Sequence, residues 1–126
     1  MPFTPGRPIA EAKADLFKDL GHSGRVRILE LLAEGERTIG QLATGMRMEL
    51  SHLSQQVTVL RRAGVVDSRR VKNTVICALR DPQTVELLAV ARRMLTRTLR
   101  DDQELLAALS RADDAVALAD PARTPA

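Results

Sequence analysis

The stretch TIGQLATGMRMELSHLSQQVTVLRRAGVV, residues 38–66, decides the fold. It begins with Thr38, and Gln41 follows three positions later, which is the Ser/Thr-x-x-Glu/Gln pattern of a helix N-terminal capping box. The pattern predicts a short helix through about Met46. After a turn, a second helix is expected from about residue 49 or 51 to 63, where Gly64 supplies a stop signal. The sequence therefore predicts two short helices joined by a tight turn.

Downstream of Gly64 the hydrophobic period changes from 3.6 residues to 2, which indicates strands. Residues 65–71 and 74–79 are rich in β-branched side chains and flank Lys72 and Asn73, so they predict a β-hairpin. Asp81 and Pro82 then predict the start of a long helix, with Asp81 as its cap and Pro82 at its first position.

Upstream, residues 9–20 predict a helix that Gly21 ends, and Ser23 is expected to cap a second helix over 23–34. The order of four helices, a hairpin and a long helix predicts a mainly α fold with a small β-hairpin. That order is typical of a winged helix-turn-helix. We expect a flexible tail over 1–8, the folded domain over 9–100, a helical extension over 101–119 and a disordered tail over 120–126.

Composition narrows the class of protein. The chain has 126 residues, one cysteine, two phenylalanines and no tryptophan or tyrosine. A single cysteine cannot form an internal disulfide, which fits a reducing cytoplasm. The chain has no long apolar run and no signal-peptide pattern, so we expect a cytoplasmic protein without membrane partners. The shortage of aromatic rings argues against single-strand binding by base stacking.

The positive charge is concentrated in one segment. The whole chain carries a net charge of +3, whereas residues 47–80 hold seven basic and two acidic side chains. Such a run is often only a solvated face. The helix expected around residues 51–63 favours a functional role for this charge, because no acidic residue that would repel a polyanion lies between Ser51 and Val66.

On a helical wheel Leu53, Val57 and Leu60 share one face, which predicts a buried side. The opposite side offers neutral hydroxyl and amide groups, which suit base edges in the major groove, followed by arginines, which suit phosphates. The candidate DNA-contacting residues on this helix are Ser51, His52, Ser54, Gln55, Thr58, Arg61 and Arg62. The hairpin adds Arg69, Arg70 and Lys72, which are expected to reach a flanking groove or the DNA backbone.

The long final helix has a second pattern. Apolar positions follow a 3-4 spacing that is typical of a coiled-coil seam, with two polar interruptions. The series is Val85, Leu88, Arg92, Leu95, Leu99, Asp102, Leu106 and Leu109. An ordinary amphipathic helix packed on its own domain would show a similar pattern.

Two stretches resemble the ArsR/SmtB family of bacterial winged-helix regulators: residues 16–32, LFKDLGHSGRVRILELL, and residues 53–66, LSQQVTVLRRAGVV. The resemblance covers roughly residues 12–95. It implies a homodimer that binds double-stranded operator DNA, usually as a repressor that an effector releases. It also adds Gln56 to the expected base-contacting residues, and Glu49 departs from the small polar residue that is commoner there.

In that family the first and last helices form the dimer interface. The resemblance therefore implies an interface that contains Leu16, Phe17, Val85, Leu88, Leu95, Leu99 and Leu106. This expectation agrees with the seam in the final helix.

The family's familiar metal sites need ligands that this chain lacks. Residues 38–46 contain no cysteine and residues 82–119 contain no histidine. We therefore expect neither site and no cofactor. A nickel or zinc site at Asp15, Asp19 and His22, or redox sensing at Cys77, stays open as an alternative, although a solvated face and a buried thiol explain these residues more simply.

Two other function classes fit the sequence less well. A helical interaction module without a DNA role would leave the neutral, amide-rich face of residues 51–58 unexplained. An enzyme is not expected, because the sequence has no Cys–His pair, Ser–His–Asp set or Gly-rich phosphate loop at a usable spacing.

Overall fold

The computed structural model describes residues 6–100 and 107–111, apart from the side chain of Leu99. The chain divides into two compact units with the boundary between Val85 and Glu86.

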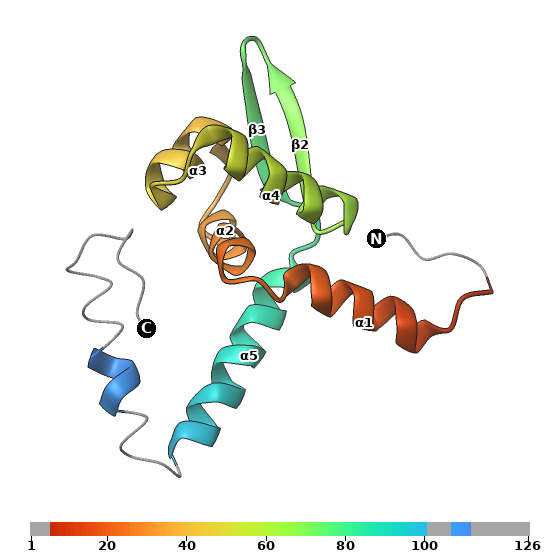
Figure 1. The fold of residues 1–126 in the computed structure, drawn as a ribbon, viewed down its shortest axis with the longest axis vertical. Coiled ribbons are helices and arrows are strands. Elements are labelled where there is room, and N and C mark those ends of the chain that lie inside the picture. Colours follow the sequence, from red (N-terminus) through yellow and green to blue (C-terminus); the bar gives the residue numbers. More distant parts are fainter. Residues whose placement is uncertain (1–5, 101–106, 112–126) are drawn as a thin grey trace. The chain divides into compact units, whose positions relative to one another are not determined.

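The first unit contains four helices and three strands, in the order that the sequence predicts apart from one additional strand (Figure 1). The helices α1 to α4 and the strands β1 to β3 follow in the order α1 (Ile9–Leu20), α2 (Ser23–Ala33), β1 (Arg37–Thr38), α3 (Ile39–Met46), α4 (Leu50–Arg62), β2 (Val66–Val71) and β3 (Thr74–Leu79). Helix α5 (Gln83–Arg100) begins in this unit and continues into the second. The prediction of a mainly α winged helix-turn-helix is confirmed.

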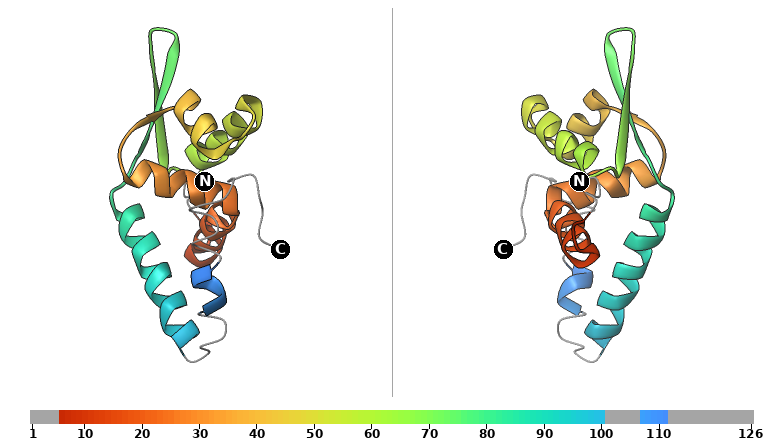
Figure 2. Two further views of the ribbon diagram at one scale, coloured as in Figure 1. Left: turned by 90° about the vertical axis from the view of Figure 1, so that its left-hand side faces the viewer. Right: turned by 90° about the vertical axis from the view of Figure 1, so that its right-hand side faces the viewer.

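The sheet has three antiparallel strands in the order β1-β3-β2. The β2–β3 hairpin was predicted, and its register pairs Ser68 with Cys77 and Arg70 with Val75. Strand β1 was not predicted, because two residues between helices carry no period that reveals a strand. It pairs Arg37 with Cys77 and so covers the other edge of β3. Figure 2 shows the hairpin projecting beyond α3 and α4.

The core forms where α2, α3 and α4 meet the sheet. Seven large side chains from α2, α3, α4, β2 and β3 are fully buried: Ile28, Leu29, Leu42, Leu53, Leu60, Val66 and Cys77. Burial of each leucine or isoleucine side chain contributes roughly 1.5–3 kcal/mol. The predicted inward face of α4 is therefore correct, and it fixes which side of α4 remains exposed.

Local signals explain most of the helix ends. The capping box is present, since the Gln41 N–H donates to Thr38 Oγ1 at 3.0 Å and the Thr38 N–H donates to Gln41 Oε1 at 2.9 Å. Gly64, two residues after the last residue of α4, has φ +82°, a conformation that glycine adopts without strain.

Two predicted helix starts need correction. The cap of α2 is His22 and not Ser23, because the Gly24 N–H donates to His22 Nδ1 at 3.1 Å. Asp81 does cap α5, accepting from the Gln83 N–H at 2.9 Å, but the helix begins at Gln83, one residue after Pro82.

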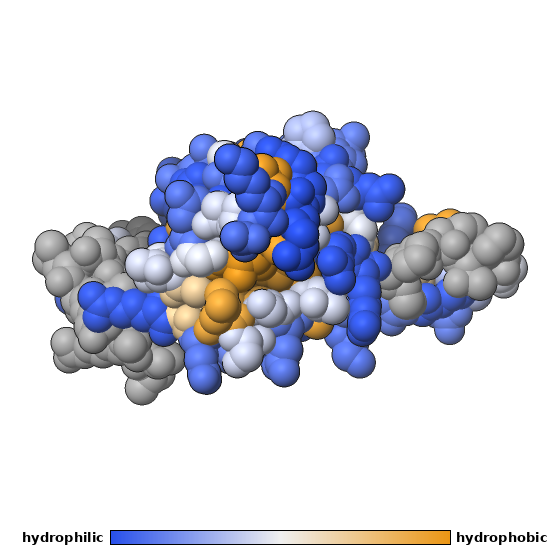
Figure 3. Space-filling model, turned by 90° about the horizontal axis from the view of Figure 1, so that it is seen from above, coloured by the Kyte–Doolittle hydropathy of each residue, from blue (hydrophilic) through white to orange (hydrophobic). Residues whose placement is uncertain are grey.

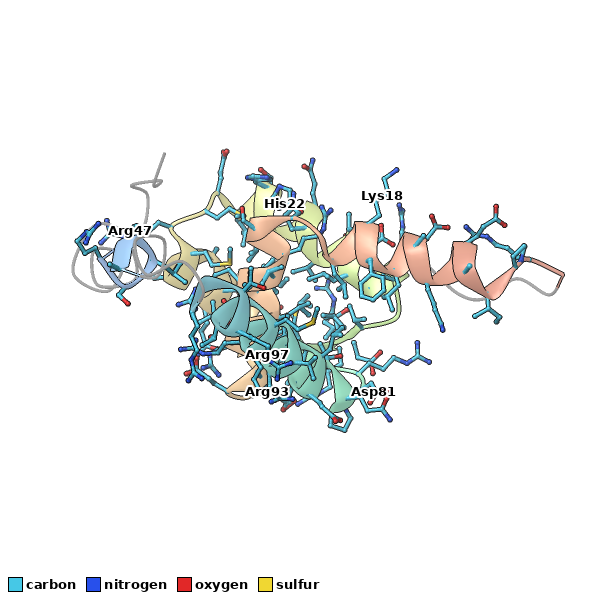
Figure 4. The ribbon with its side chains drawn as sticks, turned by 90° about the horizontal axis from the view of Figure 1, so that it is seen from below. Lys18, His22, Arg47, Asp81, Arg93 and Arg97 are labelled. Atoms are coloured by element: carbon cyan, nitrogen blue, oxygen red, sulfur yellow. The ribbon has the colours of Figure 1, made fainter. Side chains whose placement is uncertain are left out.

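In the second unit α5 is amphipathic. Four arginines and Thr96 lie on one side, and Figure 4 shows Arg93 and Arg97 one turn apart. Residues 107–111, which lie within the expected extension over 101–119, are also helical. The rest of that extension, residues 1–5 of the predicted tail over 1–8, and the predicted tail over 120–126 lie outside the described residues. Within the described residues no helix is both long and apolar enough to cross a bilayer.

Candidate nucleic-acid interface

Helix α4 presents a polar surface on the side opposite its buried residues. Ser51, His52, Gln55, Arg61 and Arg62 are exposed. Ser54, Gln56 and Thr58 are half-buried at the borders of this surface. All eight predicted residues of α4 are thus at least partly accessible, and none of them lies in the core.

A groove separates α4 from the hairpin. It has a volume of about 390 Å³ and lies beside the start of α3. Its walls combine apolar side chains with hydroxyl, amide and guanidinium groups, contributed by Ile39, Leu50, Ser54, Val57, Thr58, Arg61, Ser68, Arg70, Asn73, Thr74 and Val75. Seen from the hairpin tip, the surface is largely hydrophilic around a smaller hydrophobic area (Figure 3).

Two hydrogen bonds fix side chains of this groove. Thr58 Oγ1 donates to the Ser54 carbonyl at 2.8 Å, so the hydroxyl is already engaged with its own helix. Arg61 Nη1 donates to Ser68 Oγ at 3.4 Å, which links the last turn of α4 to β2. Arg61 therefore joins the helix to the hairpin as well as adding positive charge to the groove.

The two neighbouring arginines of β2 face opposite ways. Alternation along the strand places Arg70 with Ser68 in the groove, and Arg69 on the other face of the sheet. Arg69 donates to both carboxylate oxygens of Glu36, at 2.6 and 3.3 Å. The hydrogen bonds and the opposite charge lower the pKa of Glu36 and raise the pKa of Arg69. The sequence predicts the same role for both arginines, whereas the geometry favours only Arg70 as a groove residue.

His52 and Gln56 lie on the flank of α4 away from the hairpin. Gln56 Oε1 accepts a hydrogen bond from Arg25 Nη1 at 2.9 Å, and Gln56 Nε2 lies 3.3 Å from His52 Nε2. Gln56 is thus tied to α2, and exposed His52 is its neighbour one turn earlier.

Lys72, Arg62 and Glu49 lie at the ends of the hairpin and of α4. Lys72 is exposed at the hairpin tip with φ +57°, and Arg62 is exposed at the end of α4. Glu49 precedes α4 but its side chain makes no capping hydrogen bond. Its charge therefore remains available to repel phosphate at this end of the helix.

The candidate metal ligands do not converge. Asp15 forms an ion pair with Arg7, α1 ends at Leu20, and His22 Nδ1 is occupied by the Gly24 N–H. In the described part of the chain no group of three or more His, Cys, Asp or Glu residues is placed to hold a metal ion. Asp19, the third candidate, offers its backbone carbonyl to Arg25.

Cys77 is fully buried in β3, as expected of a small core side chain. Burial raises the pKa of its thiol, although the charge of Arg61 partly opposes this. A buried, protonated thiol reacts slowly, so the position does not favour redox sensing.

The predicted dimer residues are partly exposed. Phe17 is 58% exposed and Leu16 half-buried on α1, and Val85 and Leu95 on α5 are 42% and 61% exposed. Leu88 is half-buried. Leu106 and the side chain of Leu99 lie outside the described residues. Large exposed apolar side chains are typical of surfaces that another protein covers.

Three residues that line the groove were not predicted from the sequence. Ser68 and Asn73 contribute polar groups, and Leu50, the first residue of α4, is 54% exposed. Strand alternation could have identified Ser68, because it shares a face with Arg70. Leu50 gave no signal, since an apolar residue at a helix start is expected to be buried.

Comparisons with known proteins agree with this geometry. The family described as "Bacterial regulatory protein, arsR family" matches residues 22–68. The HTH-type transcriptional regulator Rv0081 of Mycobacterium tuberculosis is 50% identical over 95 residues, which cover 75% of this chain and 83% of that protein. Its crystal structure superposes with a TM-score of 0.71 at 49% identity, covering 76% of this chain and 97% of that one.

Two further proteins are similar over a smaller share or at lower identity. The biofilm growth-associated repressor of Agrobacterium fabrum is 36% identical over 75 residues, 60% of this chain and 64% of that protein. The solution structure of the homodimeric winged helix-turn-helix DNA-binding domain Mb0332 of Mycobacterium bovis gives a TM-score of 0.67 at 28% identity, covering 79% of this chain and 94% of that one. With these matches, the fold and the polar face of α4 beside its wing identify the chain as a DNA-binding transcriptional regulator of the ArsR family.

Proposed function

We propose that this protein is a homodimeric regulator that binds a specific double-stranded operator, most simply as a repressor. The observation that carries the proposal is the shared surface of α4 and the hairpin. Neutral hydrogen-bonding groups occupy the exposed side of α4, and a groove with arginines at its walls adjoins them. An α-helix with such groups fits the major groove.

The residues divide into two roles. Ser51, Ser54 and Gln55 carry short polar groups that can pair with base edges and so distinguish sequences. Arg61, Arg62, Arg70 and Lys72 carry charge that suits phosphates, which set affinity and orientation but not sequence. Arg69 is assigned no direct contact, because Glu36 already occupies its guanidinium.

Dimerisation is supported by two observations. Mb0332, which is similar in fold, is a homodimer. The apolar residues Phe17 and Leu95 are exposed in this chain and would be covered by a second copy. A twofold dimer would present two copies of α4 to half-sites about one helical turn apart.

Repression and release by an effector are inferred from the family, in which the Agrobacterium fabrum relative is named a repressor. We propose that the effector is not a metal at the family's familiar sites, because residues 38–46 lack cysteine and residues 82–119 lack histidine. The alternative is a protein-interaction module without a DNA role that binds a partner through the last helix, and it would leave the polar surface of α4 without a function.

The test is selection of bound sequences from a library of random 30-base-pair duplexes, followed by titration of the enriched sequence and of an unselected duplex. We expect an enriched inverted repeat, bound at least about a thousandfold more tightly than the unselected duplex at physiological salt. Gln55→Ala should reduce that ratio without changing the dimer mass in sedimentation. Enrichment of no sequence by a folded dimer would refute the proposal and favour the protein-interaction module.

A further inference from the structure

One arginine connects three helices behind the DNA-binding surface. Arg25, in the first turn of α2, donates from Nε to the carbonyl of Asp19 and from Nη2 to the carbonyl of Lys18 at 3.5 Å. Its Nη1 donates to Gln56 Oε1 at 2.9 Å. Figure 4 shows Lys18 near the end of α1 and His22 at its junction with α2.

The end of α1 fixes this guanidinium. The last carbonyls of a helix lack intrahelical partners, and the negative end of the helix dipole favours a cation. Arg25 supplies both the donors and the charge. Its planar group then has one edge held by α1, so Nη1 points in a defined direction towards α4.

That direction sets the orientation of the Gln56 amide. With Oε1 accepting from Arg25, the amide nitrogen is the group left to face His52 Nε2, 3.3 Å away. An amide nitrogen can only donate. His52 Nε2 must therefore accept, and the proton of the neutral ring must lie on Nδ1.

We propose that Arg25 is a positioning residue for DNA recognition: acting through Gln56, it holds exposed His52 as a hydrogen-bond donor through Nδ1–H. A donor at this surface pairs with acceptors in the major groove, which are guanine N7 and O6, adenine N7 and thymine O4. It is mismatched to the amino groups of cytosine and adenine. The role in recognition rests on the proposed function, whereas the ring's proton position does not.

The proton position can be measured in the free protein. Nitrogen-proton correlation spectra at about pH 8 observe neutral imidazole rings, and the chain has only two histidines, His22 and His52. His22 Nδ1 accepts from the Gly24 N–H at 3.1 Å, so its proton lies on Nε2 and provides an internal reference for the opposite form. We expect one ring of each form, assigned by loss of one set of signals in His52→Ala.

Variants test the connection. Arg25→Gln should return His52 to a mixture of the two neutral forms. Arg27→Gln is the matched control, because Arg27 lies two residues along α2 and, among the described residues, its side chain makes only an exposed ion pair with Glu30 at 3.5 Å. Gln56→Glu keeps an acceptor for Arg25 but removes the donor to His52, so Nε2 should then carry a proton. If Arg25→Gln does not fold, Gln56→Glu decides the question.

The consequence for recognition is tested with the random-duplex selection described above. In both Arg25→Gln and His52→Ala, the preference for the favoured base should fall about tenfold, and it should fall at the same base pair of each half-site. Arg27→Gln should keep the preference, and the salt dependence of Arg25→Gln should equal that of wild type.

Three results would overturn the inference. The first is a wild-type His52 ring with its proton on Nε2, and the second is a ring that Arg25→Gln and Gln56→Glu both leave unchanged. The third is full base preference in a folded Arg25→Gln protein. If the wild type enriches no sequence, the proposed function fails, while the spectra still decide the connection between Arg25 and His52.

Discussion

Replacing Arg70 or Arg69 by alanine should show that these two neighbouring arginines differ in their contribution to DNA binding. Arg70 lines the groove beside α4, whereas Arg69 lies on the opposite face of the sheet and pairs with Glu36. If Arg70 contacts a phosphate, its removal prevents the release of one condensed counterion per protomer. Arg69→Ala should leave the number of phosphate contacts unchanged.

The expected magnitude follows from counterion release. Each phosphate contact contributes about 0.9 to the slope of log K against log salt concentration, so a dimer that loses two contacts loses about 1.8. When the salt concentration rises fourfold, from about 50 to 200 mM, the affinity of wild type should therefore fall about twelvefold more than the affinity of Arg70→Ala. Arg70→Ala should be correspondingly less sensitive to salt than wild type.

The assay is fluorescence anisotropy of a labelled duplex carrying the enriched inverted repeat, at four or more salt concentrations. Arg69→Ala serves as the matched control, with a slope equal to that of wild type. Equal reductions of slope in both variants, or a reduction only in Arg69→Ala, would refute the assignment of the two faces of the hairpin.

Further predictions concern base recognition, the core, the thiol and acid stability. Gln55→Ala should weaken binding to the enriched repeat by about 1–3 kcal/mol and leave binding to an unselected duplex unchanged in competition titrations; uniform weakening would mean that Gln55 contacts the backbone. Leu60→Ala, at a fully buried position, should lower the free energy of unfolding in urea by about 2–5 kcal/mol, and a loss well below this range would contradict its core position. The Cys77 thiol, whose pKa burial raises, should react with an alkylating reagent only at the rate at which the fold opens; rapid reaction of the native protein would restore redox sensing as an alternative. Arg69 lowers the pKa of Glu36 below 4.5, so this pair stabilises the fold above that pH and loses its contribution as the pH falls further. Urea unfolding between about pH 3 and 7 should therefore show less acid sensitivity in Arg69→Ala than in wild type, and identical profiles would argue against the pair in solution.

Local patterns predicted the parts of the fold that local interactions determine. Thr38 and Gln41 identify the start of α3 because the capping box is completed within four residues. The inward face of α4 could be predicted because Leu53, Val57 and Leu60 recur at helical spacing. The two-residue loop of the hairpin was located by the β-branched runs on either side.

The remaining features depend on contacts between distant residues. Strand β1 exists because Arg37 pairs with Cys77, forty positions away, and its two residues have no pattern of their own. The hydrogen bond between Arg25 and Gln56 joins residues 31 positions apart. A helical wheel places Gln56 at the border of the polar face but cannot reveal this partner. The separation of Arg69 from Arg70 was available from strand alternation, but the Glu36 partner that occupies Arg69 was not.

The central claim is that the exposed side of α4 enters the major groove of DNA in two symmetry-related copies. Dimethyl sulfate footprinting tests it directly, because the reagent methylates guanine N7 in the major groove and adenine N3 in the minor groove. On the enriched repeat we predict protection of guanine N7 in two half-sites with centres about 10 base pairs apart. Protection confined to adenine N3, or a single protected site without a symmetry mate, would contradict the claim.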